Sequence, residues 1–150
     1  MKIGILGTGV VGEAIGSKLV QLGYEVKMGS RSANHEKAVA WAGKNGQHAS
    51  QGTFADAAAF GTIIFNCTAG IASLKALTLA GANNLKGKVL IDVANPLDFS
   101  RGMPPTLTVC NTDSLGEQIQ RAFPETKVVK TLNTLNCNLM VNPALLLSFA

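Results

Sequence analysis

The sequence predicts a single-domain α/β protein built on a doubly wound parallel sheet, because its size, composition and periodicity agree on that fold class. The chain of 150 residues has the size of one domain. Of its residues 47% are apolar but only 5% are aromatic, which is typical of small aliphatic side chains packed between a sheet and its helices. Short apolar runs alternate with stretches of helical spacing, the pattern of repeated strand and helix units.

The N-terminal half predicts three strands that alternate with three helices. Residues 2–6 form the first strand, and the helix after it carries apolar residues at helical spacing and ends at Gly23. The next elements are a strand at 24–28, a helix at 33–42, a weak strand near 47–49, and a helix at 54–60 with Thr53 as its N-cap.

The C-terminal half predicts three further strands and two further helices. Strands at 62–67 and 88–93 are apolar on both faces, as expected of central strands, and a sixth strand is expected at 127–132. Helices are expected at 73–80 and after a capping box of Ser114 and Glu117 as far as Phe123, and residues 95–111, with three prolines, form a long connection. Right-handed crossovers then place helices on both faces of the sheet.

Charge and cysteine usage exclude several function classes. The net charge of +4 comes from scattered Lys and Arg without interleaved aromatic residues, so it suits an anionic ligand or ordinary solubility but no nucleic-acid surface. Cys67, Cys110 and Cys137 form no CxxC pair and have no His at ligand spacing, which predicts reduced thiols, no metal site and a cytoplasmic location. Glycines and Glu13 interrupt the apolar N-terminus, so neither an export signal nor a membrane span is expected.

The last segment, residues 138–150, is strongly apolar and has no polar cap. An apolar end of this kind usually packs against something. We therefore expect either a homodimer formed through this segment or further sequence beyond it.

A glycine fingerprint follows the first strand and opens the first helix. Its G-x-G-x-x-G pattern occupies Gly7, Thr8, Gly9, Val10, Val11 and Gly12. Gly7 allows a tight turn, Gly9 lets the backbone approach a pyrophosphate, and Gly12 lets helix and strand pack closely. The helix N-terminus adds free N–H groups and a positive dipole. In this context the pattern predicts a Rossmann dinucleotide-binding domain.

The end of the second strand favours NADP over NAD. An NAD enzyme places Asp or Glu here to bind the ribose hydroxyls, whereas this chain has Ser30, Arg31 and Ser32. A guanidinium can bind a 2′-phosphate bidentately and either serine can donate to it. Lys37 is a candidate for a further positive charge near the 2′-phosphate, and His35 is an alternative to it. A solvent-exposed start of the helix explains the presence of both residues equally well.

Three strand ends are candidates for the nicotinamide site, because ligands of this fold bind beyond the carboxyl ends of the strands. They contribute Cys67, Thr68 and Ala69, then Asn95 and Pro96, and then Asn133. The two asparagines suit either hydrogen bonds to the ligand or turn capping, and Cys67 suits a small buried residue better than a reactive thiol.

No catalytic residue can be assigned from the sequence. Asp92 lies inside a strand, Asp98 is a weak candidate, and the two histidines fall on the adenosine side. Reduction of a ketone or imine needs a general acid, whereas hydride transfer to a flavin-like ring does not require one from the protein.

The chain resembles the coenzyme F-420:NADP oxidoreductase family, and also the cytosolic oxidoreductase domain of STEAP metalloreductases. The resemblance rests on the segments Ile5-Leu-Gly-Thr-Gly-Val-Val-Gly12, Gly29-Ser-Arg31, Val93-Ala-Asn-Pro-Leu97 and Val129-Lys-Thr-Leu-Asn-Thr134. It implies that residues 8–11 bind the pyrophosphate of NADP and that Ser30, Arg31 and Lys37 bind its 2′-phosphate. It also implies that Thr68, Ala69, Asn95 and Asn133 surround the nicotinamide.

The resemblance further implies an oxidoreductase that moves hydride between NADPH and a small-molecule acceptor, namely a deazaflavin, a flavin or a similar ring. The family continues beyond the sixth strand with elements that complete an acceptor pocket and a dimer, so residues 1–150 are expected to be its NADP-binding domain without that C-terminal part. Two alternatives stay open. One is a reductase of the hydroxyacid or pyrroline-carboxylate type, and the other is a non-catalytic NADP-sensing module.

Overall fold

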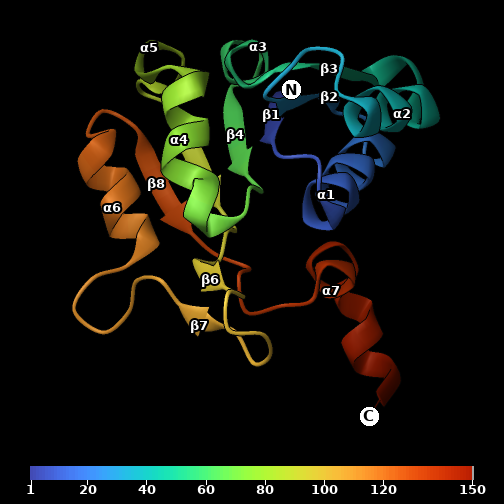
Figure 1. Cartoon of the computed structure of the whole chain (residues 1–150). Helices are drawn as coiled ribbons and strands as arrows, with labels where there is room; N and C mark the ends of the chain where they lie inside the picture. The colour runs from blue at the N-terminus through green and yellow to red at the C-terminus, as the bar shows by residue number, and fades with distance from the viewer. Residues whose placement is uncertain (150) are drawn as a thin grey trace.

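The computed structural model describes residues 1–149 and confirms the doubly wound parallel sheet in a single domain (Figure 1). Its strands are β1 (Lys2–Leu6), β2 (Glu25–Ser30), β3 (Ala49–Thr53), β4 (Ile63–Asn66), β5 (Val89–Asp92) and β8 (Lys127–Lys130), in the order β3-β2-β1-β4-β5-β8. All neighbours are parallel, with Ile3 of β1 beside Val26 of β2 and Ile63 of β4. The order reverses at β1 and β4, where this fold class forms its ligand crevice.

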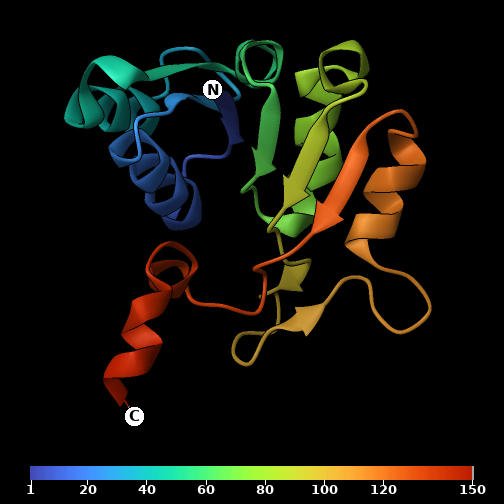
Figure 2. The same cartoon turned by 180° about the vertical axis from the view of Figure 1, so that it is seen from behind.

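Helices cover both faces of this sheet. The helices are α1 (Val10–Gln21), α2 (Glu36–Asn45), α3 (Phe54–Phe60), α4 (Gly70–Ala80), α5 (Ala82–Leu85), α6 (Leu115–Ala122) and α7 (Cys137–Val141), with 3-10 turns at Gly46–His48 and Pro143–Phe149. Figures 1 and 2 show α4 and α6 on the same face of the sheet. Ile3 and Ile5 point to the core beneath α1 and α2, whereas Leu6 points to the core beneath α3 and α4. The central strands are therefore apolar on both faces, as predicted.

Several boundaries differ from the sequence-based expectations. α2 begins at Glu36 because a turn with a hydrogen bond from His35 N to Ser32 O precedes it. α4 begins at Gly70, whose N–H donates to Asn95 O at the sheet edge. β3 runs over 49–53; its polar residues carry no strand signal, but parallel pairing with β2 places them in the sheet.

The long connection is not structureless, and a short helix was not expected. β6 (Leu97–Asp98) and β7 (Thr106–Leu107) form a small antiparallel pair inside residues 95–111, too short to leave a periodic signal. The four-residue α5 follows α4 after Gly81.

Both predicted N-caps are present. The Thr53 hydroxyl accepts from Asp56 N at 3.1 Å while Asp56 Oδ2 accepts from Thr53 N at 2.8 Å, which makes a complete capping box. The Ser114 hydroxyl accepts from Glu117 N at 3.2 Å, but the Ser114 N–H donates to Asp113 rather than to Glu117. The predicted hydrogen bond from the Ser114 N–H to the Glu117 carboxylate was therefore wrong, because the Asp113 carboxylate accepts it instead.

The C-terminal segment packs partly against the domain. Met140 and Val141 of α7 lie against the core beneath α1, whereas Leu146 is exposed, and the segment extends away from the sheet (Figures 1 and 2). Ala150, the last residue of the expected apolar segment, lies outside the described residues. Within residues 1–149, no helix combines the length and apolar character needed to span a membrane.

Candidate cofactor-binding site

The glycine fingerprint connects β1 to α1 at the point where the strand order reverses. Gly7 has φ 117° and donates from its N–H to Gly29 O, and a Cβ on Gly12 would lie 2.4 Å from Gly7 O. The fold itself therefore requires glycine at both positions.

Gly9 has no such structural reason to be glycine. It is the N-cap of α1 with φ −84° and ψ 178°, a conformation open to any residue. An ideal Cβ on Gly9 would meet no heavy atom of the described residues within 4 Å. The space above this residue lies at the positive end of the α1 dipole, where the first backbone N–H groups have no partner within the helix. A missing side chain here leaves room for a phosphate group, as the fingerprint predicts.

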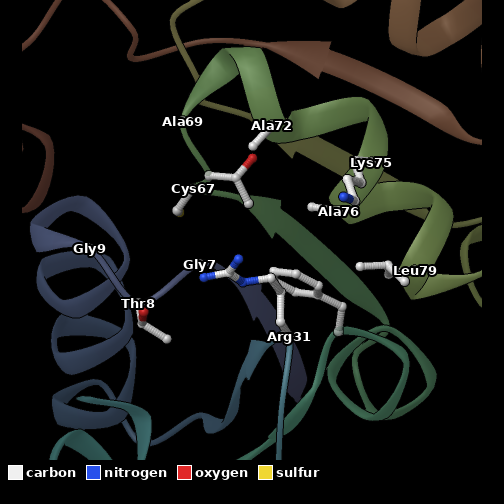
Figure 3. A pocket seen from close by; sticks show the side chains of 12 residues that line it. Gly7, Thr8, Gly9, Arg31, Cys67, Ala69, Ala72, Lys75, Ala76 and Leu79 are labelled. Atoms are coloured by element: carbon white, nitrogen blue, oxygen red, sulfur yellow. The ribbon is translucent and has the colours of Figure 1, made fainter. Parts of the chain in front are cut away.

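A first cavity of about 520 Å³ opens beside this loop (Figure 3). It is lined by Gly7, Thr8, Gly9, Arg31, Phe54, Cys67, Thr68, Ala69, Ala72, Lys75, Ala76 and Leu79. Figure 3 shows Arg31 on the β2 side of the cavity and Lys75 on α4. Its walls are otherwise largely apolar, and no carboxylate is among its lining residues. The cavity is thus suited to a flat base that carries anionic groups.

The three candidate residues at the end of β2 and in the loop after it differ in burial and in hydrogen bonding. The Ser30 side chain is buried, and its hydroxyl donates to Ser32 O at 2.6 Å and accepts from Ser32 N at 3.2 Å. This hydroxyl shapes the turn, while Arg31 and Ser32 are exposed. Lys37 lines a separate cavity of about 240 Å³ between α1 and α2. The Nδ1 atom of His35 is buried and, among the described residues, has no hydrogen-bond partner.

A second cavity, of about 480 Å³, lies at the ends of β4, β5 and β8. Its lining comprises Val11, Cys67, Thr68, Ala69, Ile71, Val93, Ala94, Asn95, Leu97, Asp98, Phe99, Asn133, Leu135 and Met140. Cys67, Thr68 and Ala69 line both cavities, so the two cavities adjoin at the end of β4. The strand ends nominated from the sequence do come together here.

The two candidate asparagines bind each other. Asn95 Nδ2 donates to Asn133 O at 2.6 Å, and Asn133 Nδ2 donates to Asn95 Oδ1 at 3.2 Å. These bonds join the ends of β5 and β8. Pro96 is not part of the lining; its carbonyl accepts from Thr108 N at 2.8 Å and holds the β6–β7 hairpin against the strand end.

A buried polar network lies beneath the second cavity. Asp92, on β5, is fully buried, and it accepts from Lys130 Nζ at 2.9 Å and from Asn66 Nδ2 at 2.8 Å. Lys130 Nζ also contacts Ala94 O. Asn66 Oδ1 in turn accepts from the Thr68 hydroxyl at 2.7 Å. The network therefore connects β8, β5 and β4 to a residue that lines both cavities.

Replacement of Asp92 by Asn should lower the free energy of unfolding by about 1–2 kcal/mol, because the Lys130 ammonium loses its counter-charge and faces an amide. Urea denaturation measures the change. The matched control is Lys86→Gln, which removes one partner of the exposed ion pair with Glu125 and should cost less than about 0.5 kcal/mol. Equal losses in the two variants would contradict a stabilising network.

The Cys67 side chain is buried in the wall that the two cavities share. Burial, and to a smaller extent the nearby charge of Asp92, raises the pKa of its thiol far above the usual range. We expect N-ethylmaleimide at pH 7.5 to label Cys110 and Cys137 in the folded protein and to leave Cys67 unmodified, with denatured protein as the control. Modification of Cys67 at the rate of Cys110, as measured by mass spectrometry, would show that its side chain is accessible.

Reasoning from the sequence missed part of the site. Ala72, Lys75, Ala76 and Leu79 lie on the face of α4 that lines the first cavity. Their i, i+3, i+4 and i+7 spacing was a usable signal, but the helix was expected to begin only at residue 73. Phe54, at the start of α3, was recognised as helical but not as part of a binding site.

Fold and site together define a Rossmann dinucleotide-binding protein with an arginine where NAD enzymes carry a carboxylate. Residues 2–96 match the family described as NADP oxidoreductase, coenzyme F420-dependent. The chain belongs to this family of NADP-dependent oxidoreductases.

Solved structures agree with this assignment. A protein from Arthrobacter sp. FB24 that is named as an F420-dependent NADP-reductase is 53% identical, with a TM-score of 0.89 over 96% of this chain and 68% of its own. The imine reductase of Streptomyces aurantiacus is 18% identical, with a TM-score of 0.65 over 87% of this chain and 40% of its own. An Aspergillus terreus imine reductase in complex with NADPH4 is 19% identical, with a TM-score of 0.64 over 92% of this chain and 43% of its own. The two imine reductases share the fold. A comparison with curated proteins finds no significant match.

Proposed function

We propose that this chain binds NADP(H) across its two cavities and supports hydride transfer between that cofactor and a flat acceptor, a deazaflavin, a flavin or a similar ring. The observation that carries the proposal is the meeting of the two cavities at Cys67, Thr68 and Ala69. An extended dinucleotide can run from Arg31 past the glycine fingerprint to the ends of β4, β5 and β8. The nicotinamide ring supplies the hydride when the cofactor is bound.

The first cavity suits the adenosine half of the cofactor. The backbone amides of Thr8 to Val11 would hold the pyrophosphate over Gly9, where the structure leaves space for it. Arg31 would bind the 2′-phosphate and Ser32 would donate to it. The Ser30 hydroxyl already forms two hydrogen bonds with the backbone of Ser32, so Ser30 would contribute by stabilising the turn that carries Arg31. Lys37 remains a candidate for longer-range attraction.

The second cavity suits the nicotinamide and the acceptor. Its lining includes Thr68, Ala69, Asn95 and Asn133, and the neighbouring hydrogen bonds join the ends of the strands. Ile71 and Phe99 are exposed apolar residues of its lining, which favours contact with a flat ring. These residues orient the two reacting rings and exclude water from between them.

The ionisable groups of the second cavity favour a flavin-like acceptor over a ketone or imine. Hydrogen bonds from Ser100 lower the pKa of Asp98, so this carboxyl is ionised near neutrality and is a poor proton donor. The Cys67 thiol, with its raised pKa, is also a poor acid. A ring that takes up hydride without a protein acid fits this lining better than a carbonyl that must be protonated.

The experiment is anaerobic oxidation of NADPH by the purified chain with coenzyme F-420, FMN, FAD, a ferric chelate or a cyclic imine, with NADPH binding measured on the same sample. Turnover with coenzyme F-420 or a flavin would support the proposal. Turnover with the imine alone would favour the imine-reductase type of chemistry and contradict it. Tight NADPH binding with no turnover by any acceptor would instead favour the NADP-sensing module.

A further inference from the structure

The first cavity has a second cation besides Arg31. Lys75 lies on α4, across the cavity from the β2–α2 loop (Figure 3). Among residues 1–149, the cationic residues that line this cavity are Arg31 and Lys75, and none of its lining residues is acidic. Neither side chain forms an ion pair within residues 1–149. Two uncompensated positive charges therefore face one largely apolar space.

The ligand proposed for this cavity needs more than one positive charge. A phosphate monoester such as the 2′-phosphate carries close to two negative charges at neutral pH, and one guanidinium balances only one of them. Lys37 was a candidate for further charge from the sequence, but it lines another cavity with Glu13 and Lys44. The Ser30 hydroxyl is already bonded within its own turn. A further cation that lines the cavity itself is thus the residue best placed to complete the charge balance.

We infer that Lys75 is a specificity-determining residue, which approaches the 2′-phosphate of NADP(H) from α4 while Arg31 binds it from the β2–α2 loop. The apolar residues Ala72, Ala76 and Leu79 on the same helix face would pack against the adenine ring, which leaves both cations available to the phosphate. A long, flexible lysine stem on an exposed helix face allows the ammonium to reach a phosphate when the ligand is present. This inference rests on the proposed binding of NADP(H) in the first cavity.

The test compares 2′,5′-ADP with 5′-AMP by isothermal titration calorimetry at low and at physiological ionic strength. Lys75→Gln should weaken the binding of 2′,5′-ADP by about fivefold and leave that of 5′-AMP within about twofold, because the two ligands differ only in the 2′-phosphate. The difference should shrink as salt rises, since the lysine is exposed. The matched control is Lys127→Gln, which removes the same charge from the exposed edge strand β8.

Other outcomes would overturn the inference. Equal weakening of both ligands by Lys75→Gln would place the lysine beside the 5′-phosphate that they share, and an unchanged affinity for both would remove Lys75 from the site. A loss of 2′,5′-ADP affinity in Lys37→Gln but not in Lys75→Gln would assign the second positive charge to Lys37 on α2. Arg31→Ala is measured alongside. If Arg31→Ala abolishes the preference for 2′,5′-ADP while Lys75→Gln has no effect, only the inference about Lys75 fails. If neither variant changes the affinities of the two ligands differently, the proposed 2′-phosphate site fails as well.

Discussion

Replacement of Gly9 by Val should weaken NADPH and NADH alike by on the order of 100-fold and leave the fold almost intact. A Cβ on Gly9 meets no protein atom within 4 Å, and the backbone there is extended, so a branched side chain fits the free protein. The same atoms would fill the space that a pyrophosphate needs above the α1 N-terminus. The free energy of unfolding should fall by less than about 1 kcal/mol, because valine is a poorer N-cap than glycine.

The control for this result is Gly12→Ala. Its new Cβ would lie 2.4 Å from Gly7 O, so this variant should lose about 2 kcal/mol of stability as well as cofactor affinity. Thermal unfolding and cofactor fluorescence titration measure the two quantities on the same samples. Retention of wild-type NADPH affinity by Gly9→Val would show that no ligand approaches the fingerprint. A large loss of stability in Gly9→Val would show that the glycine serves the fold.

Replacement of Arg31 by Ala should weaken NADPH far more than NADH, by about 1.5–3 kcal/mol for the loss of a charge-assisted contact with the 2′-phosphate. The side chain is exposed, lines the first cavity and makes no ion pair within the described residues, so folding should hardly change. Arg31→Lys keeps the charge but cannot bind bidentately, and its affinity for NADPH should fall between those of the other two proteins.

The two cofactors make this measurement specific. NADPH and NADH share every group except the 2′-phosphate, so their difference isolates that group from the pyrophosphate effect expected for Gly9→Val. Titration of both cofactors against the wild type and both Arg31 variants gives the comparison. Equal losses for NADPH and NADH in Arg31→Ala would contradict the assignment of the 2′-phosphate to this residue.

The elements most accurately predicted from the sequence were those with a local physical signature. β1 and α3 have the predicted boundaries, since an apolar run before a glycine fingerprint and an N-cap at Thr53 are both short-range features. β3 and α4 were placed less accurately. The polar β3 is held by its pairing with β2, and α4 begins where Gly70 meets the carbonyl of Asn95. Such partners lie far away in the chain and leave no periodic pattern.

The sequence by itself determined the fold class, the glycine fingerprint and the presence of arginine in place of a carboxylate after β2, because each depends on residues close together in the chain. Only the tertiary structure decided which side chains share a cavity. Asn95 and Asn133 bind each other and Lys75 faces the cavity of Arg31, whereas Lys37 lines another one. Strand order and helix packing set these distances, and neither can be derived from local propensity.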